Sequence, residues 1–112
     1  MRSEPISQVE IERELLRLID RLEIETEQFE TLAMDCAKKE ALYKSNWAKE
    51  YLSAKGSIKE REAWADYKLD HEHFDFKCAE ALVKTKREML LSIRASMDAI
   101  RTLNANVRAQ VG

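Results

Sequence analysis

The residues best suited to chemistry form one short acidic and histidine-rich segment, Asp70-His71-Glu72-His73-Phe74-Asp75. Asp70 and His73 are spaced i, i+3, as are the ligands that helical bundles present to a metal pair. A chain that folds back would place Glu40 across from His71. Such sites need carboxylates from several helices, so we expect a solvated face without metal or cofactor and keep a metal-binding helical bundle as an alternative. The sequence pairs no nucleophile with a base and has no glycine-rich phosphate loop, so we do not expect an enzyme.

A basic ridge is predicted in the C-terminal third of the chain. Its residues are Lys84, Arg87, Arg94, Arg101 and Arg108. The arginines recur every seven residues, so on a helix they share one face, and such a ridge suits contact with a phosphate backbone. The alternative, which we favour, is that these arginines pair with glutamates of the N-terminal part of the chain. The candidate glutamates are Glu10, Glu12, Glu14, Glu23 and Glu25.

Aromatic residues gather in the middle of the chain. The candidate partner-binding residues are Tyr43, Trp47, Tyr51, Trp64 and Tyr67. Trp and Tyr are favoured at the energetic centres of protein interfaces, so this group fits a protein-binding tip. The alternative is that the rings pack the end of a helical hairpin or a dimer interface.

The elements that position these groups are two long helices. Ser7 and Glu10 form one capping box, and Ser57 and Glu60 form another directly after Gly56. Gly56 suits the left-handed conformation that closes a helix. We expect a helix over about 7–55, a turn at 55–57 and a second helix over about 58–109, in a single domain spanning 1–112. The predicted fold is all-α, a long antiparallel two-helix hairpin of coiled-coil type.

Each predicted helix has an apolar seam. In the first helix the seam is Ile11, Leu15, Leu18, Leu22, Phe29, Leu32, Cys36 and Tyr43. In the second it is Trp64, Tyr67, His71, Phe74, Cys78, Leu82, Met89, Ile93, Ile100, Leu103 and Val107, with a repeat that drifts from seven towards eleven residues. Folding about Gly56 pairs Trp47 with Trp64, Tyr43 with Tyr67 and Leu18 with Ile93.

Charge favours the same antiparallel register. Residues 10–30 hold eight acids against three arginines, whereas residues 77–108 hold seven bases against three acids. Two helices of this length bury too little apolar surface to be stable alone. We therefore expect a homo-oligomer, most simply a dimer that forms a four-helix bundle. Some of the apolar residues that lie off the seam must then be covered by another chain, and these off-seam residues are Leu16, Ile19, Ile24, Met34, Leu42, Leu69, Phe76, Val83, Leu90, Leu91 and Met97.

Composition and hydropathy limit the partners and the cellular location that we expect for this protein. Charged residues make up 36% of the chain and the net charge is −2, so bulk attraction to nucleic acid or to anionic membrane is not expected. The sequence has no run of 18 apolar residues and begins without the apolar core of a signal peptide. We expect a cytoplasmic protein with reduced cysteines and no membrane contact.

Two stretches of the chain resemble a known group of proteins. SNWAKEYLSAKGSIKEREAWADY (45–67) and IRTLNANVRAQ (100–110) are similar to small helical proteins encoded in the early regions of tailed-phage and prophage genomes. The resemblance covers about two thirds of the chain and brings no functional motif with it. It implies a phage or prophage origin. Our leading hypothesis is a non-enzymatic, oligomeric accessory protein of phage DNA replication or recombination, in the host cytoplasm, that docks on a protein partner or contacts DNA weakly. The alternative is a structural scaffold or a module that inhibits a host-defence factor.

Overall fold

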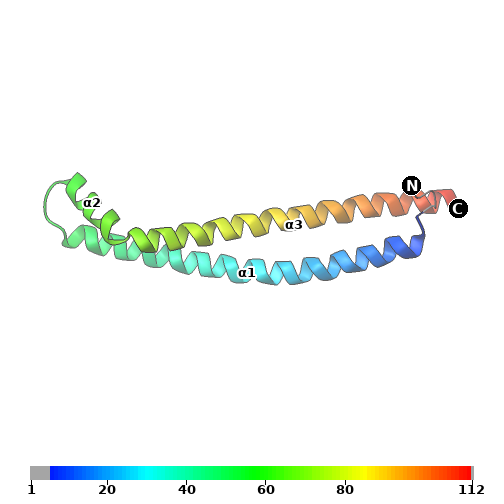
Figure 1. The fold of residues 1–112 in the computed structure, drawn as a ribbon, viewed down its shortest axis with the longest axis horizontal. Coiled ribbons are helices and arrows are strands. Elements are labelled where there is room, and N and C mark those ends of the chain that lie inside the picture. Colours follow the sequence, from blue (N-terminus) through cyan, green and yellow to red (C-terminus); the bar gives the residue numbers. More distant parts are fainter. Residues whose placement is uncertain (1–5, 112) are drawn as a thin grey trace. The chain divides into compact units, whose positions relative to one another are not determined.

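The structure, a computed structural model, describes residues 6–111, and within that range every regular element is a helix (Figure 1). The helices are α1 (Gln8–Ser53), α2 (Ile58–Lys68) and α3 (Asp70–Val111). The all-α prediction is confirmed. The chain divides into two compact units. Of the described residues, we call 6–28 with 86–111 the terminal unit and 29–85 the turn unit.

Local capping chemistry fixes two helix starts as expected. At the start of α1, the Glu10 amide donates to Ser7 Oγ at 3.1 Å and the Ser7 amide donates to Glu10 Oε2 at 3.3 Å. At the start of α2, the Glu60 amide donates to Ser57 Oγ at 3.2 Å. These bonds satisfy amide groups that have no partner inside the helix.

The chain reverses at Gly56, in the turn unit. Gly56 has φ +120°, which L side chains rarely adopt, and a Cβ at this position would lie 2.8 Å from Glu60 Oε2. Only glycine takes this conformation without strain. The predicted turn is therefore present, between the end of α1 at Ser53 and the start of α2 at Ile58.

The second half of the chain is not one continuous helix, so the expected single helix over 58–109 is wrong. Leu69 has φ −108° and ψ 21° and separates α2 from α3, which are inclined to each other in Figure 1. Backbone hydrogen bonds are kept on both sides of the bend. The Leu69 amide donates to the Ala65 carbonyl, and the His73 amide donates to the Leu69 carbonyl. The Leu69 side chain is buried, and Asp70 and Glu72 in the first turn of α3 favour a new helix start.

In the terminal unit, α1 and α3 pack in the expected register. Leu18, Ile93 and Met97 form a buried cluster, against which Leu22, Met89 and Ile100 pack. Lys86 donates from α3 to both Glu25 and Gln28 of α1, and the Lys86 and Glu25 side chains are only 15% and 16% exposed. The predicted pairing of Leu18 with Ile93 is thus confirmed.

In the turn unit the buried face differs from the predicted seam. Tyr43 lies against His73 and Phe76 instead of Tyr67, which is 74% exposed. Along α2 and α3 the buried apolar positions are Ala65, Leu69, Phe76, Ala79, Leu90, Ile93 and Met97. Leu69, Phe76, Val83, Leu90 and Met97 are spaced by seven residues, so the buried repeat is a regular heptad and the expected drift towards eleven is wrong.

The buried face also shows which of the off-seam apolar residues are covered within the chain and which stay exposed. Leu69, Phe76, Leu90 and Met97 need no second chain to cover them, because they are buried within this one. Other residues of that set do remain exposed, and these are Leu16, Ile19, Ile24, Met34, Leu42 and Leu91. The seam predicted for α1 is right, since each of its members is buried or half-buried.

Candidate interaction surface

The three predicted aromatic residues on α1 hold the turn unit together. Trp47 stacks on Tyr51 with ring centroids 5.4 Å apart, and its Nε1 donates to Asp66 Oδ1 at 2.9 Å. The Arg61 guanidinium lies 4.4 Å from the centre of the Tyr51 ring and donates through Nε to the Tyr51 carbonyl at 3.1 Å. With Tyr43 stacked at 6.1 Å on Phe76, each ring of α1 contacts the opposite side of the hairpin. These contacts favour the alternative that the aromatic residues of α1 pack the end of the hairpin.

Tyr43 sits at the edge of an acidic hollow. The hollow has a volume of about 300 Å³ and is lined by Tyr43, Asp66, Asp70 and His73. Burial raises the pKa of the Tyr43 phenol above its ordinary value of 10, and the Asp66 carboxylate raises it further while Lys77 opposes the shift. The phenol is therefore held in its neutral form well into the alkaline range.

The two predicted aromatic residues on α2 face solvent. Trp64 is 42% exposed and Tyr67 is 74% exposed, and their rings lie 6.2 Å apart. Trp64 Nε1 donates to Glu50 Oε2 at 3.0 Å, and Lys68 Nζ lies 5.1 Å from the centre of the Trp64 ring. The indole N–H of Trp64 is thus hydrogen-bonded, whereas most of the Tyr67 side chain is exposed to solvent.

Tyr67 begins an exposed apolar stripe that continues along α3. We call Tyr67, His71, Phe74, Cys78 and Leu82 the outer stripe. His71, Phe74, Cys78 and Leu82 follow one another at spacings of three and four residues, so they share one face of α3, and Tyr67 precedes them in the last turn of α2, across the bend at Leu69. Phe74 is 64% and Leu82 is 55% exposed, and Cys78 is exposed too. Sequence reasoning took these residues for the intramolecular seam, whereas they lie on the outside of the turn unit.

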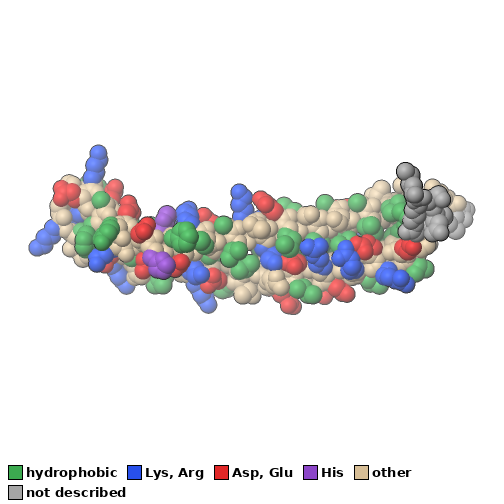
Figure 2. Space-filling model, in the orientation of Figure 1, with side chains coloured by type: hydrophobic (Ala, Val, Ile, Leu, Met, Phe, Trp, Pro, Cys, Tyr) green, Lys and Arg blue, Asp and Glu red, His purple; other side chains and the backbone are tan. Residues whose placement is uncertain are grey.

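The outer stripe stands out from the other exposed apolar residues. Hydrophobic side chains also appear among charged groups elsewhere on the surface (Figure 2). On α1, however, only Leu16 and Ile19 among the large exposed apolar residues lie within one turn of each other. The others, Val9, Ile24, Met34, Leu42 and Leu52, are each five or more residues from the nearest exposed apolar residue of that helix. Leu91 of α3 is likewise separated from Leu82 by more than two turns. A helix face with an apolar or aromatic residue on every turn is the feature that a partner helix recognises.

The basic ridge is exposed, and two of the glutamates predicted to pair with it, Glu14 and Glu25, bond to other residues. All four arginines, Arg87, Arg94, Arg101 and Arg108, are exposed, and Arg101 pairs with Asp98 of its own helix at 3.2 Å. Glu25 is bonded across the helices by Lys86, which is not one of the ridge residues. Glu14, another expected partner, pairs with Arg17 one turn along α1. Lys84 is also exposed, within the turn unit.

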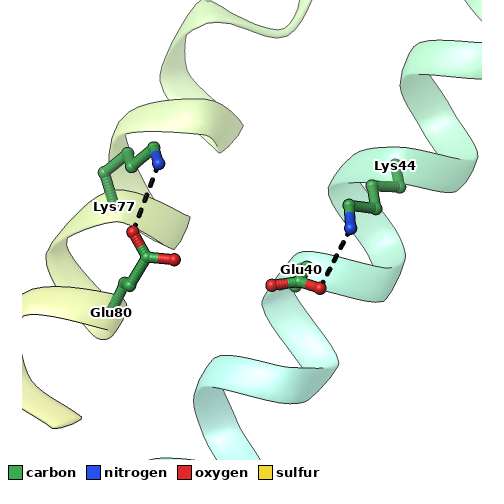
Figure 3. Close-up of polar contacts among 4 residues, drawn as sticks. All are labelled: Glu40, Lys44, Lys77 and Glu80. Atoms are coloured by element: carbon green, nitrogen blue, oxygen red, sulfur yellow. Dashed lines mark hydrogen bonds and ion pairs between the residues drawn. The ribbon is translucent and has the colours of Figure 1, made fainter. Parts of the chain in front are cut away.

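The acidic and histidine-rich segment does not assemble a ligand set. Glu40 pairs with Lys44 on α1, and Lys77 pairs with Glu80 on α3, at 3.1 and 3.2 Å (Figure 3). His71 Nε2 lies 3.7 Å from Asp75 Oδ2 of its own helix, whereas His73 lies against the Tyr43 ring. Among residues 6–111, no three or more His, Cys, Asp or Glu side chains come together as a metal would require. The arrangement gives the metal-binding alternative no support.

Neither hydropathy nor similarity identifies a known class. Within the part of the chain that the structure describes, no helix has the length and apolar character needed to cross a bilayer. Comparison of the chain with protein-family models, with curated proteins and with solved structures finds no match.

Proposed function

We propose that this protein is a non-enzymatic interaction module that works as an oligomer and associates through the outer stripe of its turn unit. One observation carries the proposal, the exposure of Phe74, Cys78 and Leu82 on one face of α3, next to the exposed Tyr67 at the end of α2. A helix face that stays in contact with water normally carries polar residues. Exposed apolar side chains on such a face favour association, because covering them with another surface lowers the free energy. Association through this face would make a four-helix assembly, at least in the turn unit.

We also propose a biological role for this interaction module. The resemblance of residues 45–67 and 100–110 to small phage-encoded proteins supports an accessory role in phage DNA replication or recombination, in the host cytoplasm. A structural scaffold, or a module that inhibits a host-defence factor, is the alternative. Both use the same kind of surface, and a protein partner is expected in each case.

A charge introduced at the centre of the outer stripe tests the proposal. We expect the mass from light scattering to rise with concentration from 13.1 kDa towards twice that value, and Phe74→Glu to keep the protein at 13.1 kDa. Leu91→Glu is the matched control, because Leu91 is 57% exposed and lies outside the stripe. A wild-type mass of 13.1 kDa at every concentration, or an equal loss of mass in both variants, would contradict the proposal.

Contact with a phosphate backbone is a second candidate, favoured by the exposure of all four ridge arginines at seven-residue spacing. Reversing the charge of Arg87, Arg94, Arg101 and Arg108 together should abolish the retention of DNA in gel-shift assays at low salt. Each phosphate contact also releases counterions, so binding should weaken steeply as salt is raised. A wild-type protein that shifts no DNA at low salt, or a quadruple variant that shifts it equally well, excludes this function.

A further inference from the structure

We propose that the outer stripe is covered by the outer stripe of a second copy of this chain, packed antiparallel so that His71 of each copy faces Phe74 of the other. This inference rests on the proposed function and names the partner and the register. In a two-fold arrangement each contact occurs twice, so one face must be complementary to itself. The sizes and the charges of the exposed residues both meet this condition.

The apolar layers match in size in this register. Tyr67, 74% exposed, faces Cys78, whose thiol is small and exposed. His71, with 83% of its side chain exposed, faces Phe74, which is 64% exposed. Large side chains therefore meet smaller ones, and two aromatic rings meet each other, as interdigitated helix packing requires.

Charged residues flank the stripe on both sides. Asp70 and Lys77 lie along one edge of α3, seven residues apart. Asp75 lies along the other edge of α3, and Lys68 precedes it by seven residues at the end of α2, across the bend at Leu69. In an antiparallel pair, each edge meets the same edge of the second copy. The proposed register places Asp70 opposite Lys77 and Lys68 opposite Asp75, each pair twice, which gives four pairs of opposite charge.

Alternative pairings bring like charges together. Sliding the second copy by seven residues in one direction places Asp70 opposite Asp70 and Lys68 opposite Lys68. Sliding it the other way places Lys77 opposite Lys77 and Asp75 opposite Asp75. A parallel pairing would set Asp70 beside Asp75. Charge thus selects one register among those that keep the apolar stripe covered.

The charged groups remain available for these contacts. The Lys77 side chain is 53% exposed and that of Asp75 is 49% exposed, and each has only a partner on its own helix, Glu80 and His71 respectively, among the ion pairs of the described residues. Tyr67 and Lys68 lie in the last turn of α2, beside the bend at Leu69. The contact spans few helical turns, so we expect association that depends strongly on concentration.

Cysteine crosslinking reads the register directly. In a Cys36→Ala background, Tyr67→Cys should yield a disulfide-linked dimer on mild oxidation, through a bond to Cys78 of the second copy. Positions 67 and 78 are three helical turns apart in one chain, so this bond cannot form within a monomer. The parent with Cys78 alone, and Leu91→Cys in the same background, should yield at least about tenfold less covalent dimer. Equal crosslinking in all three would overturn the register.

Charge reversal provides an independent measurement. Asp70→Lys or Lys77→Asp alone should shift the dimer towards monomer in sedimentation equilibrium, because like charges then face each other. The double variant should restore association, whereas a merely structural effect would leave it as weak as the single variants. If Phe74→Glu disrupts an oligomer but Tyr67→Cys does not crosslink and the double variant is not rescued, the proposed function stands and this register is wrong. If no oligomer forms at any concentration, both are wrong.

Discussion

At the scale of the residue, contacts decide which side chains remain available for binding. Tyr43, Trp47 and Tyr51 are engaged by Phe76, Asp66 and Arg61. Tyr67 and Phe74 are not enclosed in this way and stay more than half exposed. Sequence reasoning identified the aromatic group but not this division. The type of a residue indicates what it can bind, whereas its exposure depends on which helix face the fold turns inward.

The raised pKa of Tyr43 makes a prediction about alkaline pH. When tyrosinate absorbance is followed, Tyr43 should give a late step, above the ordinary pKa of 10 for a tyrosine, because burial and Asp66 disfavour its charged form. The unfolded chain loses this proton near the ordinary value of 10. Stability should therefore fall as pH rises from 10 through the raised pKa, since the unfolded state then binds fewer protons than the folded state.

Tyr43→Phe is the matched variant for this measurement. It keeps the ring on Phe76 and removes the ionisable group, so the late step in the titration should disappear and the loss of stability above pH 10 should become shallower. A late step that persists in Tyr43→Phe would assign the shifted group to another residue.

At the scale of the element, helix starts were predictable and the bend was not. The capping boxes at Ser7 and Ser57 depend on residues three apart, so local sequence is sufficient to locate them. The bend at Leu69 carries neither glycine nor proline. The Leu69 side chain is buried, which no local pattern reveals. The positive φ of Gly56 was predictable because glycine alone tolerates it.

The Lys86 contacts make a prediction about the register of α1 and α3 in the terminal unit. Lys86→Met should lower the free energy of unfolding by about 2 kcal/mol, because it leaves the largely buried Glu25 carboxylate without its partner. Glu25→Met together with Lys86→Met should recover most of this loss, since an apolar pair suits the interface. Urea denaturation of the three proteins measures both effects.

Lys44→Met is the control for a pair on the surface. Lys44 is 69% exposed and pairs with Glu40 on the same helix, so its loss should cost less than about 0.5 kcal/mol. Equal losses for Lys44→Met and Lys86→Met would show that the contacts of Lys86 do not hold the helices together.

At the scale of the whole molecule, the sequence contains two competing apolar stripes on its second half. The outer stripe has the more conspicuous residues, Tyr67, Phe74 and Leu82, and it was taken for the core. The buried stripe includes Ala79 and Lys86 between Phe76 and Leu90, which lowers its apparent hydrophobicity. Fold class, the turn and the face of α1 were therefore predictable. The buried face of α3 was not, because periodicity fits both stripes and packing against α1 selects one.

Urea denaturation of Phe74→Ala and Phe76→Ala, at protein concentrations low enough to keep the chain monomeric, tests this choice of face. The two residues have the same type and lie two positions apart on one helix, but Phe74 is 64% exposed and Phe76 is 6% exposed. We predict that Phe76→Ala lowers the free energy of unfolding by about 3 kcal/mol and that Phe74→Ala changes it by less than about 1 kcal/mol. A loss for Phe74→Ala that equals or exceeds the loss for Phe76→Ala would contradict the account.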